Sequence, residues 1–585
     1  MDPIKVDFSG KGRAKELFIP PEHAGIKLVL SIIITVIAAV VAYYFMLPPL
    51  NLKALEFYYY IAVILAAYIG STFILTKAFA RPEYIPYVKR RAIIPVIIAL
   101  IFAIILGVGY LTSTVFFRAK TYSKIIDVDT TDFGDEYSIT NISQMSDFKS
   151  VPLIDKDVAT NLGNKKLGDL SEWVSQFVID TPYSTQINLG GSPTRVLPLK
   201  YGDVFKWFNN RSTGIPAYIV VDMYTQEANA VMVEGGIKYS TSEYFQRKLA
   251  RVLRFSYPTY MYGVPSLEID EEGQPWWVCE RIDKTIGLIG GEDVIGLVLV
   301  NACTGETTYY TIDEVRAEDS PIAWVDQVYS DDLLIKQYNY YCKYEGGFIN
   351  SYIGQTGVKI TTQGASYLAN GDDVWLYTGV TSITNDDSII GFALINQRTK
   401  EAVFQKISGT TEEGARSSAE GIVSDKGWKS TFPLLLNING EATYFMALKD
   451  NDVVKSYAMV SVERVQDAVR SPSDDNPDLL ACLESYENAC AASGRYLNFN
   501  YEGELPPSGE DTENATIEGV VTDIRTAVIG GNSYYYIKLD ASDVYYSISA
   551  GSWADAVVLN TGDTVKVTYK AAEGAIIPAI RIIAE

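Results

Sequence analysis

The chain has 585 residues, with 71 Asp and Glu against 49 Lys and Arg and a single histidine. This length predicts several compact units, and an apolar content of 48% argues against wholesale disorder. Charge is unevenly distributed, because residues 1–117 carry a net charge of +5 and residues 118–585 carry −27. Because residues 118–585 are this acidic, they repel the phosphate backbone of nucleic acids, and we expect no nucleic-acid partner.

Three stretches near the N-terminus contain no charged side chain: Leu28–Leu47, Phe57–Thr76 and Ala92–Phe117. About 20 apolar residues form a helix long enough to cross the hydrocarbon layer of a bilayer. Residues 28–117 are therefore predicted to form three transmembrane helices, with membrane lipid as the first partner. Because ionisable groups are missing from these spans, we expect an anchor and not a transporter. Gly107 and Gly109 suggest close helix packing in the third span.

Basic residues in the short flanking segments predict the orientation of the spans. Ten precede the first span or follow the second: Lys5, Lys11, Arg13, Lys15, Lys27, Lys77, Arg81, Lys89, Arg90 and Arg91. Four lie on the other side: Lys53, Arg118, Lys120 and Lys124. Since cytoplasmic loops are enriched in Lys and Arg, we expect residues 1–27 to be cytoplasmic in a cell membrane and the C-terminal domain to be extracytoplasmic.

The membrane-proximal region, residues 118–210, has mixed signals. Asp127–Asn141 is polar and predicts an extended linker. Leu170–Ile179 predicts a short helix and Arg195–Leu199 a strand. The membrane-proximal region is followed by a region that spans residues 211–504. Amphipathic stretches at Ser242–Phe255 and Ser330–Tyr341 predict helices within it.

That region contains an internal repeat. Three stretches share an apolar strand, Asp or Asn, two residues, Thr, one residue and Glu; their motif residues are Asp222, Thr225 and Glu227, then Asn301, Thr304 and Glu306, then Asn396, Thr399 and Glu401. Gly296 and Gly391 are in register in the second and third copies. An Asp or Asn side chain accepts from nearby backbone amides, so the motif predicts a hairpin turn fixed by its own side chains. A ligand role is the less favoured alternative.

The repeat resembles the PepSY module of secreted and membrane-attached bacterial proteins. Asn301-ACTGE matches its pattern best, whereas Gln226 and Lys400 replace the usual glycine in the other two copies. The resemblance implies units that pair a helix with an antiparallel sheet. It also implies extracytoplasmic binding, or the inhibition or regulation of peptidases.

A Pro- and Ser-containing acidic linker, residues 505–514, precedes a run of strand signals in residues 515–585. We expect five strands, at Thr516–Arg525, Ser533–Leu539, Val544–Ser549, Thr564–Tyr569 and Ile576–Ile583. Five short strands with a small insert, Ala550–Leu559, resemble an OB-fold barrel. The nearly neutral charge of this module favours contact with protein or glycan over stacking of single-stranded nucleic acid.

Few residues suited to catalysis are present. The single histidine, His23, precedes the first span, which removes histidine-based triads and His-ligated zinc from the acidic region. We therefore predict no catalytic residues, no cofactor, no metal site and no enzymatic activity. Acidic turns at Ser473–Asp478 and Asn385–Ser388 offer oxygen ligands, but neither fits a defined calcium loop.

All five cysteines lie beyond the spans, where an extracytoplasmic location permits disulfides. Cys482 and Cys490 enclose a short helical segment and suggest a local disulfide. Cys279 and Cys303 lie within one repeat copy and suggest a second, leaving Cys342 unpaired. In the alternative, all five are reduced and pack as small apolar side chains.

The sequence thus predicts a three-helix transmembrane anchor, an α+β ectodomain of repeated helix and antiparallel-sheet units, and a small all-β barrel similar to an OB-fold. The function that fits best is a non-catalytic, membrane-anchored binding or scaffold protein of the bacterial cell envelope. Its partner would be another envelope protein, and the helices would permit oligomerisation. A regulator or inhibitor of an extracytoplasmic peptidase is the alternative, and a carboxylate-based hydrolase is less favoured.

Overall fold

A computed structural model describes residues 19–133, 151–495 and 514–584, apart from residues 318, 371–372, 439, 474–476, 530–531, 550–552 and 571–574. The basic residues before residue 19, residues 134–141 of the predicted extended linker, and residues 505–513 lie outside the described residues.

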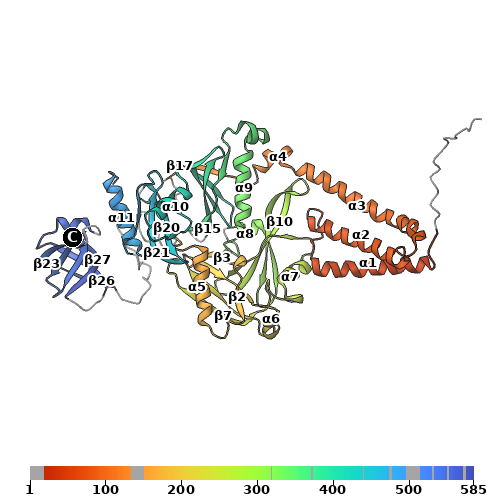
Figure 1. The fold of residues 1–585 in the computed structure, drawn as a ribbon, viewed down its shortest axis with the longest axis horizontal. Coiled ribbons are helices and arrows are strands. Elements are labelled where there is room, and N and C mark those ends of the chain that lie inside the picture. The colour runs from red at the N-terminus through yellow and green to blue at the C-terminus, as the bar shows by residue number, and fades with distance from the viewer. Residues whose placement is uncertain are drawn as a thin grey trace, which may run out of the picture.

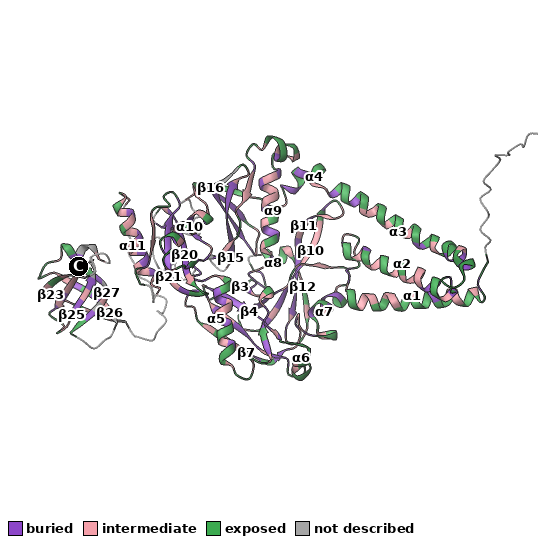
Figure 2. Ribbon diagram, viewed as in Figure 1, coloured by how far each residue is buried: buried purple, intermediate pink, exposed green. Residues whose placement is uncertain are grey.

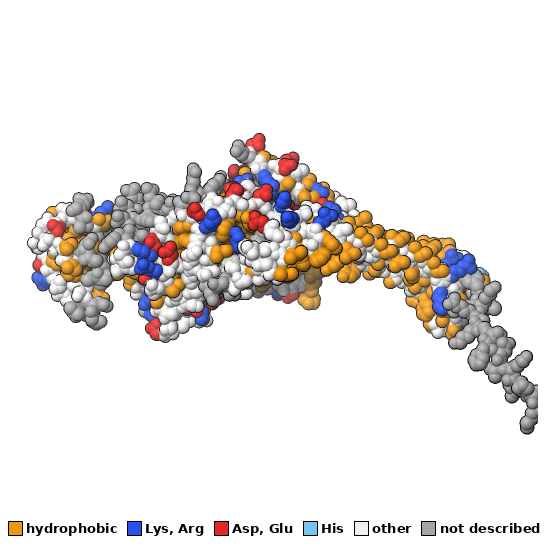
Figure 3. Space-filling view, turned by 90° about the horizontal axis from the view of Figure 1, so that it is seen from above, with side chains coloured by type: hydrophobic (Ala, Val, Ile, Leu, Met, Phe, Trp, Pro, Cys, Tyr) orange, Lys and Arg blue, Asp and Glu red, His pale blue; other side chains and the backbone are white. Residues whose placement is uncertain are grey.

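Three helices at one end of the molecule are long and apolar enough to cross a membrane. They are α1 (Ala24–Met46), α2 (Leu55–Thr76) and α3 (Ile85–Ser113) (Figure 1). Most of their side chains are exposed (Figure 2), and together they form an extended hydrophobic surface (Figure 3). So large an apolar surface is costly in water and favourable in lipid. α3 ends before Phe117, because Thr114 is extended and caps the short helix α4 (Val115–Tyr122).

The connector between α1 and α2 packs on the folded region that follows the anchor. Leu50 N donates to Pro258 O at 2.8 Å, and Lys53 forms an ion pair of 2.8 Å with Asp283. The connector and the β-rich region therefore lie at the same end of the helices, whereas the start of α1 and the connector between α2 and α3 lie at the far end (Figure 1).

Gly109 packs against that region and not against a neighbouring helix, contrary to the sequence prediction. A Cβ atom there would lie 2.8 Å from Leu288, at the tip of a β-hairpin, and Gly107 has nothing within 4 Å. The same hairpin is held to the end of α3 because Ile289 N donates to Ser113 Oγ at 3.0 Å. The third span thus ends against a hairpin of the β-rich region.

Within the described residues, the β-rich region contains four successive units, each a helix followed by a mainly antiparallel sheet. In unit 1 (151–237), α5 (Lys156–Asp169) precedes the sheet β3-β4-β6-β7, made of Thr185–Leu189, Ser192–Leu197, Ile215–Asp222 and Ala228–Ile237. A small sheet pairs β2 (Phe177–Ile179) with β5 (Leu199–Tyr201), and α6 (Val204–Asn210) precedes β6.

Unit 2 (238–311) has α7 (Leu249–Ser256) and the sheet order β12-β11-β10-β8, with β9 also pairing β10. In chain order, β8 to β12 are Met261–Tyr262, Ser266–Ile269, Pro275–Ile286, Gly290–Asn301 and Thr307–Thr311. A short helix, α8 (Ile312–Arg316), leads to unit 3.

Unit 3 (328–410) has α9 (Asp331–Tyr344) and the order β1-β17-β16-β15-β13, with β14 also pairing β15. In chain order, β13 to β17 are Lys359–Thr361, Ser366–Asn370, Asp373–Ser382, Asn385–Asn396 and Ala402–Thr410. β1 (Asp129–Asp132), from the segment that leaves the anchor, adds in parallel to the edge strand β17.

Unit 4 (411–470) has α10 (Glu412–Gly421) and the order β18-β20-β21-β22, with β19 also pairing β20. In chain order, β18 to β22 are Lys429–Ser430, Leu434–Ile438, Glu441–Asp450, Val453–Ser461 and Ala468–Arg470. α11 (Leu479–Ala492) follows and packs on β21 and β22.

The motif residues form three equivalent hairpin turns, in units 1 to 3. Asn301 Oδ1 accepts from Cys303 N and Thr304 N, both at 3.0 Å, and Glu306 N donates to Thr304 Oγ1 at 3.3 Å. Asp222 and Asn396 make the matching bonds in the other two units. Gln226 and Lys400 adopt φ values of 62° and 67°, where unit 2 has Gly305 at 77°.

The residue that follows the Asp or Asn of each motif ties the unit together, and unit 4 repeats the arrangement without the motif. In unit 2, Ala302 N donates to Pro275 O, and Ala302 O accepts from Lys238 N and Tyr239 N, which precede α7. Met223, Gln397 and Val462 likewise donate to a strand of their own unit, and their carbonyl groups accept from the segment before its helix: two amides for Gln397 and one each for Met223 and Val462. Ser461 stands where the other units have Asp or Asn, and its hydroxyl accepts from Arg464 N at 3.2 Å.

This geometry makes a prediction for the turn of unit 2. Asn301→Ala leaves two backbone amides without their acceptor, so we expect a loss of about 1–2 kcal/mol in the stability of unit 2. Glu306→Ala, in the same turn, is expected to cost less than about 0.5 kcal/mol because only the backbone of Glu306 is used. Chemical denaturation of the detergent-solubilised chain measures both, and equal losses would contradict the assigned roles.

Two sequence predictions in the membrane-proximal region are wrong. Residues 170–179 form turns and strand β2, not a helix, and the helix α5 lies earlier because Asp155 accepts from Val158 N and caps it. The proposed boundary at residue 210 falls inside unit 1, since β4 pairs with β6 across it.

The predicted disulfides do not form, and all five cysteines are free. Cys482 and Cys490 lie eight residues apart on α11, which separates them by about 12 Å along the axis, beyond the reach of a disulfide. Cys279 pairs in register with Val298, so Cys303 lies several residues further along the hairpin. Burial raises the pKa of the Cys342 thiol to about 12, and it packs as an apolar side chain.

Five strands close a barrel at the C-terminal end of the chain. Its order is β23-β24-β25-β27-β26, made in chain order of β23 (Asn514–Ile529), β24 (Asn532–Leu539), β25 (Tyr545–Ser549), β26 (Thr564–Lys570) and β27 (Ile576–Ala584). Each predicted strand overlaps one of these. Val521, Ile537 and Val565 lie in its core.

Candidate functional site

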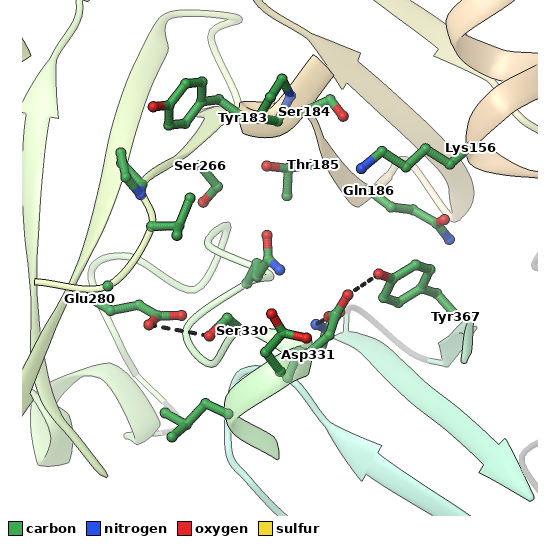
Figure 4. Close-up of a pocket in the computed structure, with 18 of the residues that line it drawn as sticks. Lys156, Tyr183, Ser184, Thr185, Gln186, Ser266, Glu280, Ser330, Asp331 and Tyr367 are labelled. Carbon is green, nitrogen blue, oxygen red and sulfur yellow. Dashed lines mark hydrogen bonds between the residues drawn. The ribbon is translucent and has the colours of Figure 1, made fainter. Parts of the chain in front are cut away.

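A pocket of about 580 Å³ lies where units 1, 2 and 3 meet (Figure 4). Unit 1 contributes the segment Tyr183–Gln186, Arg195 of β4 and Lys156 at the start of α5. Unit 2 contributes Gly263–Ser266 and Glu280 of β10. Unit 3 contributes the start of α9 and two side chains that hold it, Tyr367 and Gln397. A cavity of this volume is typical of a small-molecule site.

Four acidic residues line the wall formed by units 2 and 3: Glu280, Glu292, Asp331 and Asp332. Glu292 forms ion pairs with Lys284 and Lys336. Glu280 and Asp331 are the two whose pKa burial raises. Glu280 is 3% exposed, and its carboxyl accepts from Ser330 Oγ at 3.4 Å. Burial raises the pKa of Glu280 to about 8, so this group is mostly protonated at neutral pH. Asp331 accepts from Gln397 Nε2 at 2.6 Å and from the hydroxyl of Tyr367. Burial raises the pKa of Asp331 as well.

Two cations lie on the opposite wall, in unit 1. Arg195 is 4% exposed and donates through Nη2 to Ser184 O at 3.0 Å and Ser184 Oγ at 2.9 Å. Lys156 is exposed at the rim, and within the described residues it forms no ion pair. Partial burial, together with repulsion from Arg195, lowers the pKa of Lys156.

Three buried donors on the same wall have no hydrogen-bond partner among the described residues: Thr185 Oγ1, Gln186 Nε2 and Arg195 Nε. Their side chains are 2%, 5% and 4% exposed. Buried polar groups are nearly always paired, and each unpaired one costs about 1–3 kcal/mol. Beside a cavity, these donors are available to a bound molecule or to water.

Buried acids also brace the junction behind the pocket. Glu268 accepts from Asp326 N at 2.9 Å and Gln327 N at 3.2 Å, which joins unit 2 to the segment before α9. Asp326 in turn accepts from Asn188 N of unit 1 at 2.7 Å. Burial raises the pKa of Glu268 to about 7 and that of Asp326 well above its usual value. The relative positions of the three units are thus fixed by polar contacts.

The sequence did not indicate this pocket. None of the nine motif residues lines it, although Gln397 lies next to Asn396 and reaches Asp331. The pocket residues are far apart in the chain and follow no shared spacing, so only the packing of three units brings them together. Within the described part of the chain, no group of three His, Cys, Asp or Glu residues could hold a metal ion.

The raised pKa of Glu280 predicts a dependence of stability on pH. The unfolded state releases this proton near pH 4.5 and the folded state near pH 8, so stability falls as pH rises between these values. The expected slope is about 1.4 kcal/mol per pH unit for this group. Glu280→Gln should remove that slope and raise the melting temperature at pH 8, whereas Glu306→Gln, on an exposed turn, should change neither.

Thermal unfolding of the detergent-solubilised chain between pH 5 and pH 8 measures this. A profile for Glu280→Gln parallel to that of the unmodified chain would contradict the assignment. Glu268 also contributes to the slope in the same direction, so the variant flattens the profile without abolishing its pH dependence.

Comparisons with known proteins give no assignment. No family model matches the chain, and no curated protein matches it. Among solved structures, the chain has a likeness to an alpha-L-arabinanase of Penicillium chrysogenum, at 11% identity and a TM-score of 0.10. The matched region covers 56% of this chain and 67% of the arabinanase chain. A TM-score this low carries no argument about fold or function.

Proposed function

We propose that this chain is a membrane-anchored, extracytoplasmic binding or scaffold protein of the bacterial cell envelope, without catalytic activity. The observation that supports it best is the pocket at the junction of units 1, 2 and 3, where three buried donors have no partner among the described residues. The PepSY-like units and the OB-like barrel would then serve to make contacts. The partner we propose is another envelope protein, with oligomers formed through the helices.

The proposed orientation places the start of α1 in the cytoplasm and the four units outside. The excess of Lys and Arg on the N-terminal side supports it. The packing of the first connector on unit 2 also supports it, because three spans then place residues 77–84 on the opposite side from the units.

Regulation or inhibition of an extracytoplasmic peptidase is the first alternative, and it rests on the resemblance to PepSY modules. The purified chain would then slow a secreted peptidase in a defined assay. A carboxylate-based hydrolase is the second alternative. Glu280 and Asp331 favour it, since both line one pocket and burial raises both pKa values. Hydrolysis that is lost in both Glu280→Gln and Asp331→Asn would support it.

Site-specific photocrosslinking in native membranes tests binding at the pocket. A photoreactive phenylalanine analogue at Tyr183, which lines the pocket, is expected to give one defined adduct. The same analogue at Tyr244, exposed in unit 2 and outside the pocket, is the matched control. Equal adducts at both positions, or none at Tyr183, would contradict a binding role for this pocket.

A further inference from the structure

Charges on the pocket wall are not balanced at the end formed by unit 1. Lys156 and Arg195 line this end, and Arg195 repels Lys156. Of the four acidic residues that line the pocket, Glu280, Glu292, Asp331 and Asp332, Asp331 is the one that attracts both cations. Asp157 also attracts both cations, but it is exposed and lies outside the pocket. Arginine stays protonated even when buried, so two cations face one carboxylate here. This end therefore favours an additional anion.

The hydrogen-bonding groups at this end also lack acceptors. Gln186 Nε2 and Arg195 Nε are donors only, and Thr185 Oγ1 can donate as well. Asp331 cannot serve them readily, because Tyr367 and Gln397 already donate to its two oxygens. An incoming group with several acceptor lone pairs and a negative charge would pair with these donors. A carboxylate has two such oxygens and forms strong hydrogen bonds with Arg and Lys.

The other end of the pocket is polar, and Glu292 and Lys336, which line it, are paired with each other in an ion pair of 2.6 Å. Burial favours the protonated form of Glu280, and Ser266 and Ser330 offer hydroxyl groups beside it. Figure 4 shows Lys156 and Thr185 on one side of the cavity, with Glu280 and Ser330 on the other. A second anionic group there would meet the carboxyl of Glu280, whereas a hydroxyl or amide group would find donors and acceptors. The pocket thus differs in polarity from one end to the other.

We infer that this pocket binds a small organic carboxylate, whose anionic group is held by Arg195, Lys156 and Gln186 and whose uncharged polar end lies beside Glu280. The inference rests on the proposed binding function and specifies its ligand class. Lys156, at the rim, lies where an entering anion meets the protein first.

Thermal unfolding of the detergent-solubilised full chain tests the ligand class. The probes are N-acetylalanine, lactate and succinate, each compared with its uncharged amide, and inorganic phosphate. At least one carboxylate is expected to raise the melting temperature saturably by several degrees, and its amide is not. Lys156→Gln is expected to weaken the binding of that carboxylate about tenfold, which corresponds to the loss of one charged contact.

Lys165→Gln, on an exposed position of the same helix α5, is the matched control and should bind as the unmodified chain does. Arg195→Gln should abolish binding. Because Arg195 is buried, Arg195→Gln can misfold, and in that case the exposed Lys156→Gln still tests the inference. No shift with any carboxylate, equal shifts with an amide, a shift with phosphate alone, or full binding by Lys156→Gln would each overturn the inference. A defined photoadduct at Tyr183 would still support the proposed function in those cases.

Discussion

Alanine at Gly391 is expected to unfold unit 3, and alanine at Gly296 to unfold unit 2. A Cβ atom at Gly391 would lie 2.3 Å from Gln405 O, and one at Gly296 would lie 2.4 Å from Tyr310 O. Both contacts are with the backbone of the neighbouring strand, which cannot move without breaking the ladder. We expect each substitution to cost about 3 kcal/mol or more, at the upper end of overpacking effects.

Gly168→Ala is the matched control, because a Cβ atom there meets nothing within 4 Å and the residue lies in α5. Alanine is the better helix former, so a gain of about 0.5–1 kcal/mol is expected. Limited proteolysis of the solubilised chain reports the unit that unfolds in each variant. Melting temperatures for Gly296→Ala and Gly391→Ala equal to that of the unmodified chain would refute the proposed strand contacts.

Arg254→Ala is expected to loosen the contact between the α1–α2 connector and unit 2. The buried guanidinium donates to Leu47 O at 2.9 Å, at the end of α1, and to Pro258 O at 3.2 Å and Tyr260 O at 2.6 Å. Charged hydrogen bonds of this kind are worth about 1.5–3 kcal/mol each, and truncation leaves buried carbonyl groups without a donor. We expect a loss of about 3 kcal/mol in the contact between the connector and unit 2.

Hydrogen exchange of residues 47–54 measures this loss, and exchange there should increase more than a hundredfold, as a change of about 3 kcal/mol implies. Arg247→Ala is the control, because its guanidinium donates to Arg211 O in an exposed contact. Unchanged exchange in Arg254→Ala would show that the connector is held by other contacts.

The three apolar helices and the individual strands could be predicted from local sequence, but the pocket could not. The three helices follow from charge-free runs of sufficient length, and the five barrel strands from alternation between turn signals. Asp222, Asn301 and Asn396 mark their turns because the side chain bonds to its own neighbours. Unit 4 was not recognised as a copy of the repeat, because Ser461 replaces the Asp or Asn of the motif. The backbone hydrogen bonds of Val462 nevertheless match those of the other units.

The pocket depends on packing between units, which no local pattern reports. Arg195 and Asp331 come from different units, and only the assembled fold brings their charges together. The disulfide prediction failed for a different reason, because the helix expected between Cys482 and Cys490 runs unbroken through both and holds them too far apart to bond.

Labelling of intact cells with a membrane-impermeant maleimide tests the central claim, that a three-helix anchor holds the units outside the cell. Single cysteines are introduced as Lys165→Cys on α5 and Ala80→Cys between α2 and α3, in a chain that also carries Cys303→Ala, since Cys303 is half-buried. We predict labelling of Lys165→Cys in intact cells, and of Ala80→Cys only after permeabilisation. The reverse pattern, or labelling of both positions in intact cells, would contradict the anchored, outward-facing arrangement.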